Sequence, residues 1–149
     1  MTPSLNNPGF HPKPDVRQTQ VMLIDDNIDQ LALLHQAIRR GLPNLKVIPA
    51  ATGVEALVYL ESHAHQPWAM PKLILLDLYL PRREDGWHTL LGIQQLPPPF
   101  NRIPVIILSA SNDQDDIRAA YRRGCLTYLI KPTTTVGWQA YCNTLTSLW

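Results

Sequence analysis

Long apolar segments are missing from this sequence of 149 residues. None of its hydrophobic runs approaches the ~18 residues that indicate a membrane-spanning helix. The N-terminal stretch MTPSLNNPGFHPKPDVRQTQ also has no apolar segment of the kind that marks a secretory signal peptide. These absences argue against a membrane protein, and we expect a cytoplasmic location.

Excess charge and paired cysteines are lacking as well. The formal net charge is +1, and beyond residue 20 there are 11 basic and 11 acidic residues. Nucleic-acid-binding surfaces normally carry a basic excess, so this balance argues against such a partner. The two cysteines, Cys125 and Cys142, have no metal-ligand spacing and indicate free thiols in a reducing compartment.

Proline is concentrated at the start of the chain, where four prolines lie in the first fourteen residues. Together with Asn and Gly they predict a flexible tail over residues 1–20. The remainder, residues 21–149, has the length of one domain with a real core.

Short apolar runs alternate with helical patterns throughout that domain. This alternation predicts an α/β fold, with a parallel sheet and helices on both faces. The expected strands are residues 21–24, 45–49, 72–77, 103–109 and 126–130, and the expected helices are 28–41, 53–62, 87–95, 111–123 and 136–148.

Polar side chains stand where four of these strands end. Asp25 and Asp26 follow the first strand, Asp77 ends the third, Ser109 ends the fourth and Lys131 follows the fifth. Two like charges 4 Å apart cost about 4 kcal/mol at an effective dielectric constant near 20, so clustered carboxylates need a cation. Oxygen ligands suit Mg²⁺. An Asp beside Mg²⁺ and a lysine is a candidate nucleophile toward phosphorus.

Four segments at these strand ends, LIDDN, LLDLYLP…DG, VIILSAS and YLIKP, resemble the receiver domains of two-component response regulators. The resemblance runs from about residue 21 to the C-terminus. It implies a flavodoxin-like, three-layer fold with five parallel strands in the order 2-1-3-4-5 and five helices. The loop PRREDG has one residue more than the usual pattern, and LPPPFNR lengthens the approach to the fourth strand. No further module follows Trp149, so we expect a stand-alone receiver.

The resemblance also implies a role for each site residue. Asp77 would accept the phosphoryl group, Lys131 would bind the phosphate before a cis-Pro132, and Ser109 and Tyr128 would be the switch hydroxyl and the switch aromatic ring. The implied Mg²⁺ ligands are Asp26 directly, Asp25 through water, Asp77 and the backbone carbonyl of Tyr79. Such a protein catalyses only its own phosphorylation and dephosphorylation, and is not an enzyme in the usual sense.

The implied partners are a histidine kinase or histidine phosphotransfer protein upstream and a protein target downstream, which the sequence does not name. Phosphorylation would move the Tyr128 ring inward and change the surface of the fourth helix, fifth strand and fifth helix, where a partner or a second copy would bind. Tyr79 and Ser111 lie two residues after the acceptor and the switch hydroxyl. A large ring and a small neutral residue at these positions predict a long-lived aspartyl phosphate, because no group there orients the attacking water.

Alternative interpretations stay open at this stage. The domain could bind partners without phosphorylation, as a pseudo-receiver. A haloacid-dehalogenase-like phosphatase also uses an Asp nucleophile, but that family carries Asp-x-Asp on its first strand, where this chain has Asp25-Asp26-Asn27. Asp25 could instead cap the helix that follows it, and Tyr128 could be a fixed core residue.

Overall fold

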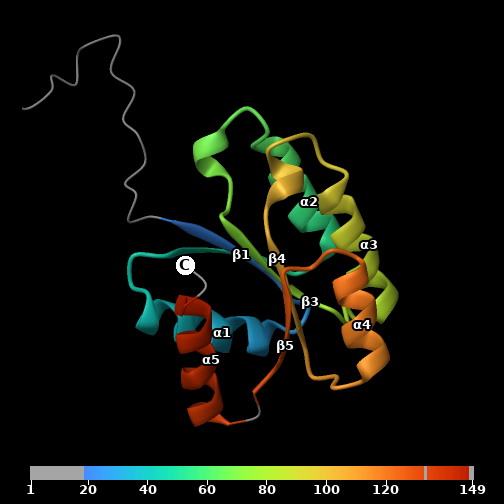
Figure 1. The fold of residues 1–149 in the computed structure, drawn as a ribbon. Helices are drawn as coiled ribbons and strands as arrows, with labels where there is room; N and C mark the ends of the chain where they lie inside the picture. The colour runs from blue at the N-terminus through green and yellow to red at the C-terminus, as the bar shows by residue number, and fades with distance from the viewer. Residues whose placement is uncertain (1–18, 133, 148–149) are drawn as a thin grey trace, which may run out of the picture.

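The computed structural model describes residues 19–132 and 134–147, which form one parallel sheet with helices on both faces (Figure 1). The strands lie in the order β2-β1-β3-β4-β5, and every neighbouring pair is parallel. The predicted α/β fold, strand order and five helices are therefore confirmed. The strands are β1 (Gln20–Ile24), β2 (Lys46–Ala50), β3 (Leu73–Asp77), β4 (Val105–Ser109) and β5 (Thr127–Ile130).

The central strands form because their sequences are continuous apolar runs. Every residue of β3 and of β4 is buried, as expected for parallel strands that are covered on both faces. Their last residues, Asp77 and Ser109, are buried too. The sheet thus delivers polar side chains to its C-terminal edge without exposing the strands that carry them.

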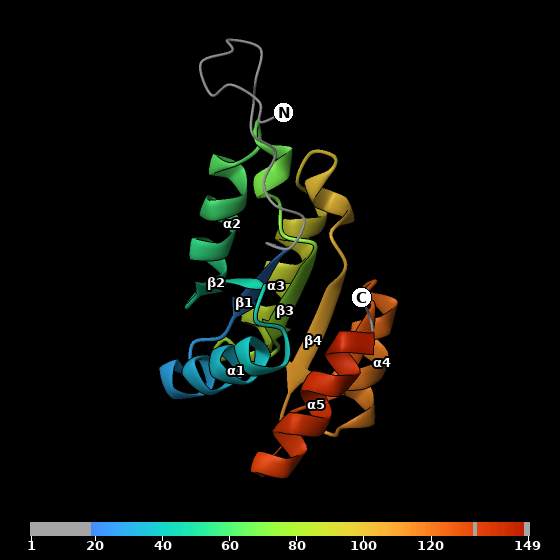
Figure 2. The same ribbon diagram turned by 90° about the vertical axis from the view of Figure 1, so that its left-hand side faces the viewer.

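Helices divide between the two faces of the sheet. The helices α1 and α5 cover one face, and α2, α3 and α4 cover the other (Figures 1 and 2). Each face of the sheet has its own apolar cluster. On one face, side chains of β1 and β3 pack with Leu34 and Ile38 of α1. On the other face, the alternate side chains of the same two strands pack with Leu90 and Ile93 of α3. The helices are α1 (Ile28–Gly41), α2 (Gly53–Ser62), α3 (Arg83–Gln94), α4 (Gln114–Arg122) and α5 (Thr135–Ser147), with short 3₁₀ helices at Pro67–Ala69 and Phe100–Arg102.

The helix α3 begins at Arg83, four residues before the predicted start at Trp87. Its first turn is polar, so hydrophobic periodicity does not reveal it. The Asp85 side chain accepts a hydrogen bond from the backbone N–H of Arg82, which satisfies one of the unpaired donors at the helix start. The first turn of α3 packs closely on the backbone that follows β3, because a Cβ atom at Gly86 would overlap the carbonyl of Leu78.

Three expectations concern other parts of the chain. The predicted tail over residues 1–20 lies almost entirely outside the described residues, but its last residue, Gln20, belongs to β1 and pairs with Lys46. Among the described residues, the cis peptide bonds precede Pro81 and Pro99, so the cis bond predicted before Pro132 is wrong. Within the same residues, no helix is long and apolar enough to span a membrane.

Candidate functional site

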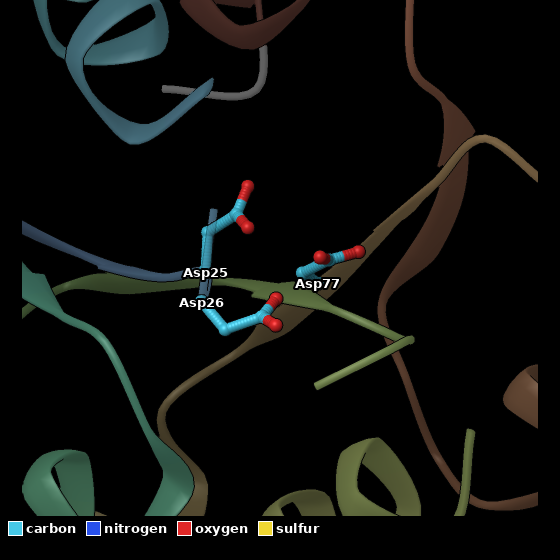
Figure 3. A group of neighbouring side chains, drawn as sticks. All are labelled: Asp25, Asp26 and Asp77. Atoms are coloured by element: carbon cyan, nitrogen blue, oxygen red, sulfur yellow. The ribbon is translucent and has the colours of Figure 1, made fainter. Parts of the chain in front are cut away.

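Three carboxylates meet at the C-terminal edge of the sheet. Asp25 and Asp26 follow β1, and Asp77 ends the adjacent strand β3, so parallel pairing places all three side by side (Figure 3). One oxygen from each lies within 4.8 Å of those of the other two. Asp25 and Asp77 are buried, whereas Asp26 is exposed. The cluster therefore has two acids in a shielded position and one facing water.

Lys131 is the cation that the buried acids contact. Its Nζ atom lies 3.1 Å from Asp25 Oδ2 and 3.3 Å from Asp77 Oδ2, and its side chain is 8% exposed. It also donates to Gln30 Oε1 of α1, at 2.6 Å. An ammonium has three donors, and these three oxygens lie within reach of them. Lys131, which follows β5, is thus held between Asp25 after β1 and Asp77 at the end of β3.

Asp77 has an unusual protonation equilibrium. Burial raises the pKa of its carboxyl from the usual 3.8 to about 7; the positive charge of Lys131 opposes this rise, and the nearby Asp25 adds to it. Without a further cation, much of the Asp77 population is protonated at neutral pH. A metal ion would therefore favour the ionised, nucleophilic form.

The donor set of this cluster fits a hard divalent cation. It consists of carboxylate oxygens, which such ions prefer, and the exposed Asp26 leaves the site open to solvent and to further ligands. Mg²⁺ keeps several waters in sites of this kind. The residues present can therefore hold such a metal ion.

Asp25 does not cap α1, which resolves one of the alternatives. The cap is Asn27, whose side chain accepts from the backbone N–H of Gln30. Asp25 Oδ1 instead accepts from the backbone N–H of Asn27, at 2.9 Å. That bond fixes the carboxylate and leaves its other oxygen to Lys131.

The predicted switch residues lie on β4 and β5, and Ser109 ends the strand next to the one that carries Asp77. The Ser109 hydroxyl is fully buried and accepts from the backbone N–H of Ser111, at 3.0 Å. Tyr128 is 8% exposed, and its hydroxyl donates to the Ser111 carbonyl, at 2.8 Å. The side chain lies inward in this structure, and its movement on phosphorylation stays a prediction.

A third buried carboxylate, Asp116 of α4, is the main feature that sequence reasoning missed. Its oxygens accept from Arg83 Nη1 at 2.7 Å, from the Tyr79 hydroxyl at 2.8 Å and from the Ser111 hydroxyl at 2.8 Å. Burial alone would raise the pKa of this carboxyl, but these hydrogen bonds outweigh burial and lower it. Asp116 is therefore ionised at neutral pH.

The structure thus brings together the residues that the sequence singled out at four strand ends. Gln30 and Asp116 were not among them. Each lies inside a helix with other polar residues, and its partners are remote in sequence: Gln30 is 101 positions from Lys131, and Asp116 is 37 from Tyr79. The sequence does carry one signal for Asp116: it is an acid in the first turn of the helix that follows the strand ending at Ser109.

Comparisons with known proteins identify relatives over most of the chain. The response regulator receiver domain matches residues 21–138. Response regulator Rcp1 of Synechocystis is 31% identical over 112 residues, which cover 74% of this chain and 75% of Rcp1.

Two solved structures are similar in fold. The phosphorylated cyanobacterial phytochrome response regulator RcpA superimposes with a TM-score of 0.76 at 29% identity, covering 89% of this chain and 94% of RcpA. Rcp1 in its Mn²⁺-bound form gives a TM-score of 0.70 at 28% identity, covering 88% and 94% of the two chains.

Proposed function

The chain belongs to the response regulator receiver-domain family, and from that premise we propose that Asp77 accepts a phosphoryl group in a Mg²⁺-dependent reaction. The donor would be a histidine kinase or a histidine phosphotransfer protein. The observation that supports this most directly is the contact of Lys131 with both Asp25 and Asp77 beside the exposed Asp26. This arrangement supplies a nucleophile, a fixed positive charge and an open cation site.

In the proposed reaction, an Asp77 oxygen attacks the phosphorus atom of a phosphohistidine. The new phosphorus–oxygen bond forms as the phosphorus–nitrogen bond breaks, and the imidazole nitrogen keeps the electron pair. Lys131 contacts Asp77, so its ammonium would also bind an oxygen of the transferred phosphoryl group. The Ser109 hydroxyl would donate to another of these oxygens. The ion, when bound, supplies positive charge to those oxygens; its ligands would be Asp25 (through water), Asp26, Asp77 and the Tyr79 carbonyl.

The proposed output surface consists of α4, β5 and α5. Several large apolar side chains there are exposed by about half or more, and exposed apolar groups are typical of interaction sites. The same surface would bind the downstream target or a second copy of the chain. These side chains are Tyr121, Leu126, Ile130 and Val136.

Two related structures add support. The fold is similar to that of RcpA, which was solved phosphorylated, and to that of Rcp1, which was solved with Mn²⁺. We propose that this chain binds a divalent ion and a phosphoryl group at the corresponding position. We also propose that residues 21–149 form the receiver, together with Gln20, which is the first residue of β1.

The test is phosphorylation by a small-molecule donor. Wild-type protein with Mg²⁺ and acetyl phosphate should show a shifted band on a Phos-tag gel, and Asp77→Asn should not. Asp29→Asn, which removes an exposed acid of α1, is the matched control and should shift like the wild type. Labelling that persists in Asp77→Asn would place the acceptor elsewhere.

The competing interpretation is a pseudo-receiver that binds partners without phosphorylation. It predicts no shifted band in any variant, with or without Mg²⁺. The retention of every acid, of Lys131 and of Ser109 in one cluster disfavours it, because a binding module has no need for two buried acids that share one ammonium.

A further inference from the structure

The buried carboxylate of Asp116 has no place in the reaction just described. It lies in the first turn of α4, and its side chain is 1% exposed. Nevertheless it accepts hydrogen bonds from three side chains that come from three different segments: Tyr79 after β3, Arg83 of α3 and Ser111 after β4. A buried charge is costly unless it is paired and hydrogen-bonded, and here it is both. Asp116 is therefore a fixed junction between these segments.

The Tyr79 partner extends from the acceptor strand itself. Tyr79 lies two residues after Asp77, in the loop that follows β3. Its hydroxyl donates to Asp116 Oδ2 of α4, at 2.8 Å. The backbone beside it is fixed as well, since Leu78 is fully buried and its N–H donates to the Leu108 carbonyl. The Tyr79 side chain therefore ties the loop after the acceptor to α4.

The Ser111 partner reaches the other half of the site. Its hydroxyl donates to Asp116, its backbone N–H donates to the Ser109 hydroxyl oxygen, and its carbonyl accepts from Tyr128. The position of the Ser109 oxygen therefore depends on where Asp116 holds Ser111. One carboxylate thus holds both the Tyr79 side chain, two residues after the acceptor, and Ser111, which contacts the hydroxyl proposed to meet the phosphoryl group.

We infer that Asp116 is a positioning residue for phosphoryl chemistry at Asp77, acting through Tyr79 and Ser111. It keeps the Tyr79 ring in place against incoming water, and it keeps the Ser109 oxygen where a phosphoryl group can meet it. The inference rests on the proposed function. Release of the carboxylate should leave the acceptor reactive but shorten the life of the aspartyl phosphate.

The experiment measures loss of phosphate from labelled protein in Mg²⁺. Asp116→Ala should hydrolyse about tenfold faster than wild type, because water reaches the phosphoryl group more easily; this is less than the roughly 10²–10⁴-fold that a positioned water-orienting group supplies. Asp116→Asn keeps one acceptor oxygen and should restore most of the lifetime. The matched control is Asp115→Ala, which removes an exposed acid from the same helical turn and should stay within about twofold of wild type.

A second variant keeps the test decisive if Asp116→Ala does not fold. Tyr79→Phe retains the ring and removes only the hydroxyl that Asp116 accepts from, so its hydrolysis should also be faster. The effects of Tyr79→Phe and Asp116→Ala should be less than additive in the double variant, because both remove the same contact. A purely structural role of Asp116 predicts additivity and no rescue by Asn.

The outcomes separate the two proposals. If wild type is labelled but Asp116→Ala and Tyr79→Phe lose phosphate at the wild-type rate or more slowly, the positioning role is wrong and the proposed function stands. If acetyl phosphate labels no form of the protein, both proposals fail together.

Discussion

Replacing Asp77 by Asn should stabilise the fold, and by an amount that grows with pH. Asp77 is 7% exposed, and its pKa in the folded protein is about 7 compared with the usual 3.8. Because the folded pKa is the higher one, the folded state binds more protons between these values. The free energy of unfolding of the wild type therefore falls as pH rises from about 4 to 7, and stays lowered above that range.

The size of the effect follows from the difference between the two pKa values. One pKa unit corresponds to about 1.4 kcal/mol, so the ionised Asp77 costs the fold about 4 kcal/mol above pH 7. At pH 5 the cost is already about 1.5 kcal/mol, because an unfolded Asp is mostly ionised there. Asn cannot ionise. The stability difference between Asp77→Asn and wild type should therefore increase by about 2.5 kcal/mol from pH 5 to pH 8.

Urea unfolding in EDTA, followed by tryptophan fluorescence and circular dichroism at several pH values, measures this difference. Using the difference between variant and wild type cancels the titration of groups common to both. Asp29→Asn controls for the loss of one exposed negative charge. Mg²⁺ at pH 8 should stabilise the wild type more than Asp77→Asn, since ligands stabilise the state that binds them. A difference that stays constant or shrinks as pH rises would refute the reasoning.

Three further predictions follow from single contacts. Asp26→Ala should weaken Mg²⁺ binding at least about tenfold in a calorimetric titration; unchanged affinity would remove Asp26 from the ligand set. Lys131→Met should slow labelling by acetyl phosphate at pH 7 about tenfold or more, because it removes the charge that lowers the pKa of Asp77; a wild-type initial rate would contradict this. Gly86→Ala should cost about 1–3 kcal/mol in urea unfolding, because its Cβ meets the Leu78 carbonyl; an unchanged midpoint would show that the turn can relax.

Much of the fold can be read from the sequence because buried parallel strands are short apolar runs that end in polar residues. The runs before Asp25, Asp77 and Ser109 identify three strands and their chemically active ends together. Parallel pairing then brings these ends to one edge of the sheet. The start of α3 is harder to predict from the sequence, since its first turn from Arg83 is polar and carries no apolar periodicity.

The contacts around the acids could not be predicted in the same way. A helical Gln or Asp has no local pattern that reveals a partner on a distant strand, so Gln30 and Asp116 emerged only with the three-dimensional arrangement. The conformation of Tyr128 is a similar case. Its strand position predicts a half-buried aromatic ring, but only the hydrogen bond to Ser111 shows that the ring is already inside.

The lysine that joins the two buried acids has a consequence for the making of the protein. Asp25 follows β1, the first strand of this sheet to be synthesised, and Lys131 follows β5, the last. A growing chain can pair β1, β2 and β3 while its acids still lack their ammonium. The contacts of Lys131 with Asp25 and Asp77 can therefore form only after residue 131 has been synthesised. A chain truncated ahead of it would carry the acceptor Asp77 but not the ammonium that lies beside it.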